Sequence, residues 1–232
     1  MPDLSRRSLV AGTGLLLGTL ALPATSQQQI ATANVAKFRA QPLTFNPEKI
    51  KWLSAKLIAS HYEEYARAVG RLNAITEQLA QLDFANTQPS AIGDLKREQH
   101  LVFNSTLFHE LYFECLGDAP TQPAGVFAQA LSRDFGSLDR WKAEFTATGK
   151  ALTGGSGLVI LAYAPRDKRL IVHSAADYGM APAAGVPLLV LDMYEHAYQA
   201  DYGSDSAKYV DSFVQMIRWI TAERLYREAI RV

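Results

Sequence analysis

Apolar side chains recur at intervals of three and four residues in the first half of the chain, which predicts two long amphipathic helices. The first covers Ala55–Gln81 and follows Ser54, a residue type that caps helix N-termini. The second covers Asp94–Cys115, after a polar loop at 83–93 that contains Pro89. Because only this loop joins them, the two helices predict a hairpin.

The second half of the chain first continues the helical spacing and then changes to short apolar runs. Val126–Phe135 and Leu138–Thr148 keep the helical spacing, and Tyr209–Arg231 predicts a single closing amphipathic helix. Gly157–Tyr163 and Arg169–His173 are short apolar runs separated by a polar turn, which predicts a β-hairpin.

A third apolar run, Pro187–Leu191, has no polar interruption, which is typical of a strand buried on both faces. These elements predict an α+β fold: an N-terminal long-helix hairpin packed on a C-terminal domain with a small three-stranded antiparallel sheet flanked by helices. Pro120 and Pro123 break the chain between the two parts. The predicted segments are an export signal (1–26), an extended linker (27–46), a helical hairpin domain (47–120) and an α/β C-terminal domain (121–232).

The first 26 residues have the pattern of an export signal. Arg6 and Arg7 precede an apolar stretch, Leu9–Leu22, and small residues follow at Ala24 and Ser26. The arginine pair predicts the twin-arginine route and a periplasmic or otherwise exported protein; a plain secretory signal or an uncleaved anchor is the alternative. Because the apolar stretch is short for a membrane span, we expect no membrane association after the signal is removed.

Composition excludes several classes of protein. The 23 basic and 23 acidic residues cancel, which argues against nucleic acid as a partner. Cys115 is the single cysteine of the sequence, so the chain has no internal disulfide, and we expect this thiol to be a small buried apolar group.

Candidate chemistry gathers where the third predicted strand ends. Asp192 follows the buried run directly, and His196 comes four residues later, so a hard oxygen and an imidazole reach one point. His61 and His109 lie on the apolar faces of the two long helices and could complete a site for iron or manganese. Two alternatives stay open: Asp192 as a helix cap, and the histidines as hydrogen-bonded core residues. The other histidines, His100 and His173, are expected at the surface or in the hairpin.

Residues 187–198 read Pro-Leu-Leu-Val-Leu-Asp-Met-Tyr-Glu-His-Ala-Tyr, which resembles the signature D-x-W-E-H-A-Y of the iron/manganese superoxide dismutases. The resemblance covers residues 45–231. Further segments that resemble this family are Ser54–Asn73, Phe108–Phe113, Asp134–Leu138 and Gly155–Gly157.

The resemblance implies that His61, His109, Asp192 and His196 hold one iron or manganese ion per subunit. It also implies the reaction: one superoxide anion is oxidised to oxygen and a second is reduced to hydrogen peroxide. Glu195 matches the family glutamate that reaches a ligand histidine of the partner subunit, so the resemblance implies a homodimer.

Around the four ligands the chain departs from the family pattern. On an ungapped alignment, Val69 replaces the gateway tyrosine and Tyr65 replaces its partner histidine. The glutamine that contacts bound solvent in the family becomes Ser105 on the helix or Asp177 in the sheet. Tyr65, Asp177 and Glu195 are therefore the predicted catalytic residues, and the alternative for Asp177 is a solvated hairpin residue.

Two functions follow from this combination. The first is an exported superoxide dismutase that uses iron or manganese. The second is a metal-binding or redox-sensing protein on the same fold that is not a dismutase, because the surroundings of the ligands have diverged. The ligand types do not separate iron from manganese.

Overall fold

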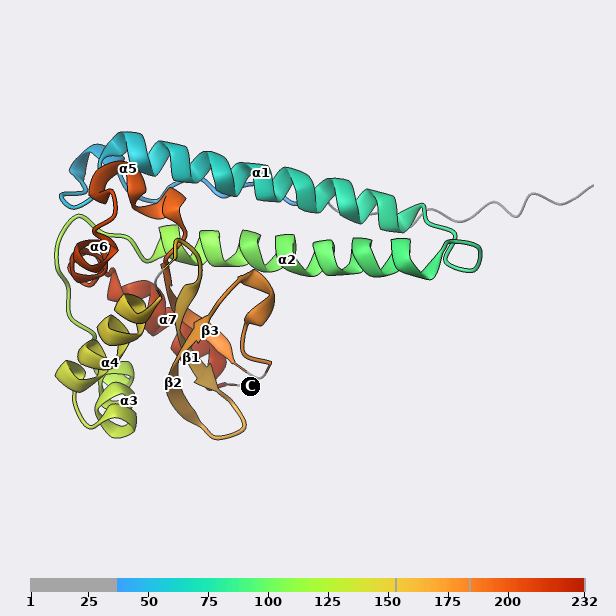
Figure 1. The fold of residues 1–232 in the computed structure, drawn as a ribbon. Coiled ribbons are helices and arrows are strands. Elements are labelled where there is room, and N and C mark those ends of the chain that lie inside the picture. The colour runs from blue at the N-terminus through green and yellow to red at the C-terminus, as the bar shows by residue number, and fades with distance from the viewer. Residues whose placement is uncertain (1–36, 153, 184, 232) are drawn as a thin grey trace, which may run out of the picture. The chain divides into compact units, whose positions relative to one another are not determined.

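The computed structural model describes residues 37–152, 154–183 and 185–231, so the predicted signal at 1–26 lies outside them. The predicted α+β fold class is confirmed (Figure 1). The helices of the described residues are α1 (Ala55–Ala80), α2 (Pro89–Glu114), α3 (Gly125–Phe135), α4 (Leu138–Ala151), α5 (Gln199–Tyr202), α6 (Ser206–Phe213) and α7 (Trp219–Ala229). The strands are β1 (Leu158–Ala164), β2 (Arg169–Ala175) and β3 (Val186–Asp192), and the short 3-10 helices are η1 (Pro47–Lys49), η2 (Tyr178–Met180) and η3 (Glu195–Ala197).

The two long helices form an antiparallel hairpin of 26 residues each, as the spacing predicts (Figure 1). Ser54 caps α1, since its side chain accepts a hydrogen bond from the backbone N–H of Leu57. Among the described residues, no helix combines the length and the apolar character needed to cross a membrane. The buried face of α1 consists of Leu57, Ile58, His61, Tyr65, Val69, Leu72, Ile75 and Leu79.

The start of α2 differs from the prediction: the helix begins at Pro89, five residues before Asp94. The predicted loop treated this proline as a breaker. At the first helical position, however, a proline loses nothing, because the N–H it lacks would have no intrahelical acceptor. The connection between α1 and α2 is correspondingly shorter.

The sheet has the strand order β2-β1-β3 with both pairs antiparallel. In the central strand β1, every residue is buried, and Leu158 at its start pairs with Asp192 at the end of β3. β3 is buried from Leu188 to Asp192, which agrees with the unbroken apolar run in the sequence. The predicted three-stranded antiparallel sheet is therefore confirmed, and it delivers Asp192 to a buried edge.

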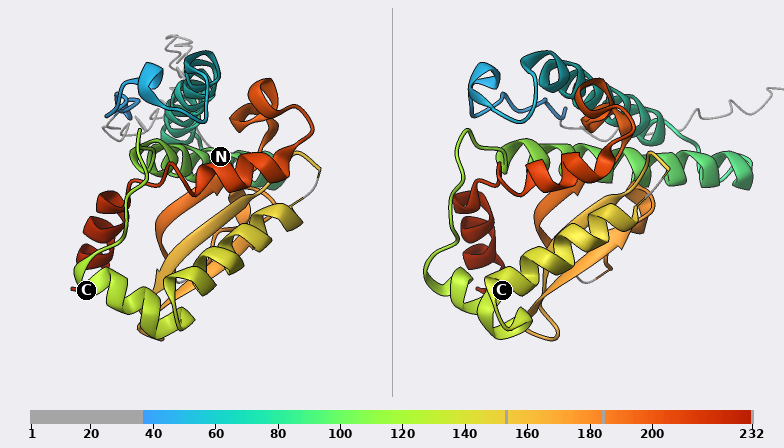
Figure 2. Two further views of the ribbon diagram at one scale, coloured as in Figure 1. Left: turned by 90° about the vertical axis from the view of Figure 1, so that its left-hand side faces the viewer. Right: turned by 60° about the vertical axis from the view of Figure 1, so that its left-hand side comes forward.

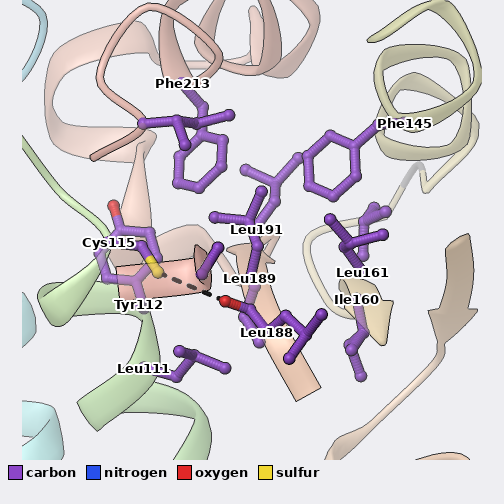
Figure 3. Packing of buried hydrophobic residues seen from close by; sticks show 14 of the residues in the cluster. Leu111, Tyr112, Cys115, Phe145, Ile160, Leu161, Leu188, Leu189, Leu191 and Phe213 are labelled. Carbon is purple, nitrogen blue, oxygen red and sulfur yellow. Dashed lines mark hydrogen bonds between the residues drawn. The ribbon is translucent and has the colours of Figure 1, made fainter. Parts of the chain in front are cut away.

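Helices cover the sheet on both sides (Figure 2). α4 contacts β1 and β2 and α3 contacts β2, whereas α2 and α7 contact β3. Figure 3 shows the core between them, where Phe145 of α4 and Phe213 of α6 lie near Leu191 of β3. Cys115 is fully buried there, and its Sγ donates to the backbone oxygen of Leu188 at 3.7 Å, as expected for a structural thiol.

The predicted closing helix, Tyr209–Arg231, is wrong as a single element, because α6 ends at Phe213 and α7 starts at Trp219. Between them the chain pairs with the segment that follows α2. The backbone N–H of Gly117 donates to Met216 O, and the N–H of Arg218 donates to Cys115 O, both at 2.7 Å. Met216 is buried by this pairing, so the apolar pattern continues while the helix does not. The pairing also joins the two parts of the chain across the predicted boundary at 120/121.

Candidate metal centre

The structure brings together the four side chains that the sequence predicts as metal ligands. One ligand atom from each of His61, His109, Asp192 and His196 lies within 4.8 Å of the others. The first three residues are buried, and the side chain of His196 is 24 % exposed. The cluster therefore lies in the interior, with its solvent side at His196.

Each ligand is placed by a different element. His61 comes from the buried face of α1 and His109 from that of α2, so the hairpin supplies two imidazoles. β3 ends at Asp192, whose backbone oxygen accepts a hydrogen bond from the buried Tyr209 hydroxyl at 2.9 Å. The short helix η3 follows this strand and places His196 next to the carboxylate of Asp192.

The carboxylate of Asp192 uses its two oxygens differently. Oδ1 accepts from the backbone N–H of Tyr194 at 2.8 Å, which fixes the turn after β3. Oδ2 faces the imidazoles and lies 3.2 Å from Nε2 of His196, 3.3 Å from Nε2 of His61 and 3.9 Å from Nε2 of His109. Capping and ligand positioning, which the sequence left as alternatives, are therefore compatible at this residue.

The distances suit one metal ion. Nitrogen and oxygen ligands that each lie about 2.1 Å from a common ion are separated by about 3–4 Å, which matches the spacing around Oδ2. Nε2 of His61 and Nε2 of His109 are buried and have no hydrogen-bond partner among the described residues. Buried polar atoms are normally satisfied, and a metal ion would satisfy both.

Backbone contacts set the protonation of His109. Its Nδ1 lies 2.7 Å from the backbone oxygen of Ser105, which can only accept, so Nδ1 carries the proton and donates it. The lone pair is thereby left on Nε2, which faces the cluster. This arrangement, in which a backbone carbonyl orients the ring, is typical of metal-binding histidines.

The interior shifts the titration of these groups in directions that suit a metal. Burial lowers the pKa of His61, and burial together with nearby His61 lowers the pKa of His109 to about 4. Burial opposes ionisation of Asp192, yet the nearby imidazoles of His196 and His61 hold its pKa below the usual value. Burial lowers the pKa of His196, but the hydrogen bond to Asp192 and the negative charge of Asp192 together raise it above the usual value. Two neutral imidazoles and an ionised carboxylate are thus present at neutral pH.

Tyr65 lies beside the cluster, but its hydroxyl is engaged elsewhere. The ring stacks on that of His109 with centroids 6.1 Å apart. The hydroxyl donates to Glu110 Oε1 at 2.8 Å and accepts from the backbone N–H of Gln41 at 2.7 Å. Burial is the main reason that its pKa is raised. The structure therefore brings the Tyr65 ring to the ligands and directs its polar atom to Gln41 and Glu110.

Asp177 is not brought to the cluster. Its side chain is exposed, and Oδ1 accepts from the backbone N–H of Gly179 at 2.7 Å, so it caps η2. Its exposure agrees with the alternative of a solvated hairpin residue, although Asp177 lies in the turn after β2 and not within the hairpin itself. At the other aligned glutamine position, Ser105 Oγ lies 3.3 Å from His109 Nδ1. At the aligned gateway position, Val69 is buried on α1.

The sequence reasoning missed Tyr178, the residue after Asp177. Its ring centroid lies 5.7 Å from that of His109. The ring also stacks on Tyr194 at 4.7 Å with an angle of 3°, and Tyr194 is parallel to His196. A three-residue helix has no periodicity to read; the available signal was the capping aspartate, which precedes the inward-facing ring.

Glu195 lies at the surface next to the ligand His196. Its side chain packs over Gly155, where φ is +79° and an added Cβ would lie 2.7 Å from Glu195 Oε1. Glycine is required there both for the backbone conformation and for this close approach. The predicted contact of Glu195 with a partner subunit stays a prediction.

Three imidazoles and one carboxylate, buried between a helical hairpin and a small sheet, define a protein with a site for a single transition-metal ion. Comparison with known proteins narrows this class. Residues 123–225 match the C-terminal domain of the iron/manganese superoxide dismutases. Superoxide dismutase [Fe] of Cupriavidus metallidurans is 50% identical over 195 residues, which cover 84% of this chain and 98% of that protein. The chain belongs to the iron/manganese superoxide dismutase family.

More distant relatives carry names with either metal. Superoxide dismutase [Fe] of Aquifex aeolicus is 30% identical over 193 residues, covering 80% of this chain and 89% of the relative. Superoxide dismutase [Mn] 2 of Halobacterium salinarum is 31% identical over 170 residues, covering 72% of this chain and 83% of the relative. Similarity to this family therefore leaves both metals as candidates.

Proposed function

We propose that this protein is a superoxide dismutase that holds one iron or manganese ion per subunit through His61, His109, Asp192 and His196. The observation that carries the proposal is the buried cluster, in which two Nε2 atoms lack partners among the described residues and face one carboxylate oxygen. Such a metal ion supplies one-electron chemistry, by which two superoxide anions and two protons become oxygen and hydrogen peroxide.

The chain's own residues prepare the site for this chemistry. Ser105 O fixes the proton of His109 on Nδ1, and Tyr194 N–H fixes Asp192 Oδ1. The ligands are therefore oriented before an ion binds, which keeps the reorganisation between two oxidation states small. One carboxylate among neutral imidazoles leaves a net positive charge with a divalent or trivalent ion, which favours binding of an anion.

Superoxide reaches this site past charged side chains of α1. Arg67 is 60% exposed and forms an ion pair with Glu64. Arg67 lowers and Glu64 raises the pKa of His196, although burial and Asp192 have larger effects on it, so both charges act on the solvent side of the cluster. Because the whole chain has no net charge, local attraction by Arg67 is the means by which an anion would be drawn in.

The direct test measures metal content and superoxide turnover on the purified protein without residues 1–26. We expect about one iron or manganese ion per chain and turnover that depends on the ion. The variant His109→Ala should lose the ion, because it removes a buried ligand. The exposed His100 is a matched control, so His100→Ala should keep the ion.

A second function has one specific observation in its favour. Val69 stands at the position of the family's gateway tyrosine, and Tyr65 stands at the position of its partner histidine. The Tyr65 hydroxyl donates to Glu110 and not toward the cluster, so the family's usual residues for proton delivery are absent at these two positions. Full metal occupancy without turnover would therefore favour a metal-binding or redox-sensing protein on this fold.

Two finer proposals concern assembly and export. The exposed Glu195 beside His196 supports a homodimer in which this glutamate reaches the partner subunit; Glu195→Ala should then shift the protein toward monomer in size-exclusion chromatography. The pair Arg6 and Arg7 supports export by the twin-arginine route. Replacing both arginines by lysine in a reporter fusion should block export, and unaffected export would contradict this route.

A further inference from the structure

The Tyr178 hydroxyl is a buried polar group that makes no hydrogen bond of standard geometry among the described residues, although the Ser105 side chain lies close enough to lower its pKa. An unpaired buried hydroxyl costs free energy, so a ligand that accepts a hydrogen bond at this place would satisfy it. Its surroundings indicate which side of the cluster it faces. The ring is 5.7 Å from His109 and lies parallel to Tyr194, which in turn is parallel to His196.

Three polar contacts fix the segment that carries Tyr178. Asn104 Nδ2 donates to the backbone oxygen of Tyr178 at 2.6 Å, and His100 Nε2 lies 3.1 Å from the backbone oxygen of Gly179. Asp177 caps the same turn through the N–H of Gly179. η2 is thus fastened to α2, the helix that supplies His109, so the position of the Tyr178 ring relative to the cluster is set by the fold.

The hydroxyl also stays protonated. The phenol of a tyrosine has an ordinary pKa of about 10, so it is protonated at neutral pH. A neutral phenol in this place is a hydrogen-bond donor.

The side chain at the aligned glutamine position next to His109 is short. Ser105 stands where the family resemblance implies a glutamine, and its shorter side chain lies with Oγ 3.3 Å from His109 Nδ1. The Tyr178 ring lies beside the same histidine, with ring centroids 5.7 Å apart.

We propose that the Tyr178 hydroxyl donates a hydrogen bond to the anion or water that binds beside the metal ion. This inference rests on the proposed function, since it needs a metal in the cluster. Tyr178 is then the hydrogen-bond donor to the substrate anion, and Asp177, His100 and Asn104 are positioning residues that hold it in place.

The experiment compares azide binding to the iron-loaded protein and its Tyr178→Phe variant, followed by the optical absorption of the ferric ion. Phenylalanine keeps the stack on Tyr194 and removes only the hydroxyl. We expect azide to bind about ten-fold more weakly, because one hydrogen bond to an anion is lost, and the reduction potential of the ion to shift. Tyr226→Phe, a core tyrosine that packs on Phe127, is the matched control and should bind azide as the unchanged protein does.

Each result decides the question. An unchanged azide affinity in a metal-loaded Tyr178→Phe protein overturns the inference. Should that variant fail to fold or to hold iron, Asn104→Ala replaces it: a weaker azide affinity supports the role of η2, and an unchanged one overturns it. Tyr178-dependent azide binding without superoxide turnover would overturn the proposed function and leave this inference standing. Superoxide turnover with azide binding that does not depend on Tyr178 would overturn this inference and leave the proposed function standing.

Discussion

Removal of the Tyr209 hydroxyl should destabilise the metal-free protein and weaken its affinity for a metal ion. Tyr209 is fully buried, and its hydroxyl donates to the backbone oxygen of Asp192 at 2.9 Å and lies 3.3 Å from the Tyr112 hydroxyl. Tyr209→Phe keeps the ring in the core but removes a hydrogen-bond partner from the backbone oxygen of Asp192 and from the Tyr112 hydroxyl. A buried polar group that loses its partner costs about 1–3 kcal/mol.

For a folded unit of this size, each kcal/mol lowers the melting temperature by about 2–4 °C, so we expect a decrease of about 2–12 °C. Metal affinity should fall as well, since the hydroxyl holds the end of β3 that carries Asp192. Thermal and urea unfolding of the chelator-treated protein measure the loss of stability. Competition with a chromophoric chelator measures the loss of metal affinity.

Tyr62→Phe is the control for this measurement. The Tyr62 hydroxyl donates to the backbone oxygen of Gln41 in an exposed setting, where the loss should stay within about 0.5 kcal/mol. If Tyr209→Phe and Tyr62→Phe unfold at the same urea concentration, the argument that a buried hydroxyl network supports Asp192 is refuted.

Further predictions concern pH and packing. Burial holds the pKa values of His61 and His109 below 6.5 in the folded state, so the unfolded chain binds more protons below that pH. The metal-free protein should therefore lose stability as the pH falls from about 6.5 to about 4, less the opposite contribution of His196, whose pKa is raised; a urea midpoint that does not change over this range would contradict the pKa directions. A Cβ at Gly149 in α4 would lie 2.9 Å from a leucine of β3, so Gly149→Ala should cost about 1–3 kcal/mol in urea unfolding. Gly70→Ala in α1 meets nothing within 4 Å and should instead stabilise by about 0.5–1 kcal/mol; equal effects of the two substitutions would contradict the packing argument.

The parts of the fold that the sequence predicts well are those with a regular period. α1 begins at the residue after its Ser54 cap, and all three strands lie within two residues of the apolar runs. The four predicted ligands lie at fixed positions on these regular elements. Their convergence on one point was therefore accessible from the sequence, both from residue chemistry and from the family resemblance.

The failures lie where a tertiary contact replaces a local rule. The break between α6 and α7 arises because Met216 and Arg218 pair with the segment after α2, and no helical period reports such a pairing. Tyr178 was missed for a related reason: hydrogen bonds from Asn104 and His100, which are distant in sequence, determine where η2 lies. Alignment alone pointed to Asp177, one residue away, which faces solvent.

The ligand cluster combines residues that are far apart in the sequence, and this determines when a growing chain can bind an ion. His61 lies in α1, whereas Asp192 and His196 lie at the end of β3 and in η3, which α5, α6 and α7 follow. A growing chain that has completed the α1–α2 hairpin therefore holds only half of the ligands. Tight metal binding must wait until β3 and η3 have packed against the hairpin, and a bound ion then links the hairpin to these later segments. Its stabilising effect belongs to the finished fold, which makes metal retention a measure of complete folding.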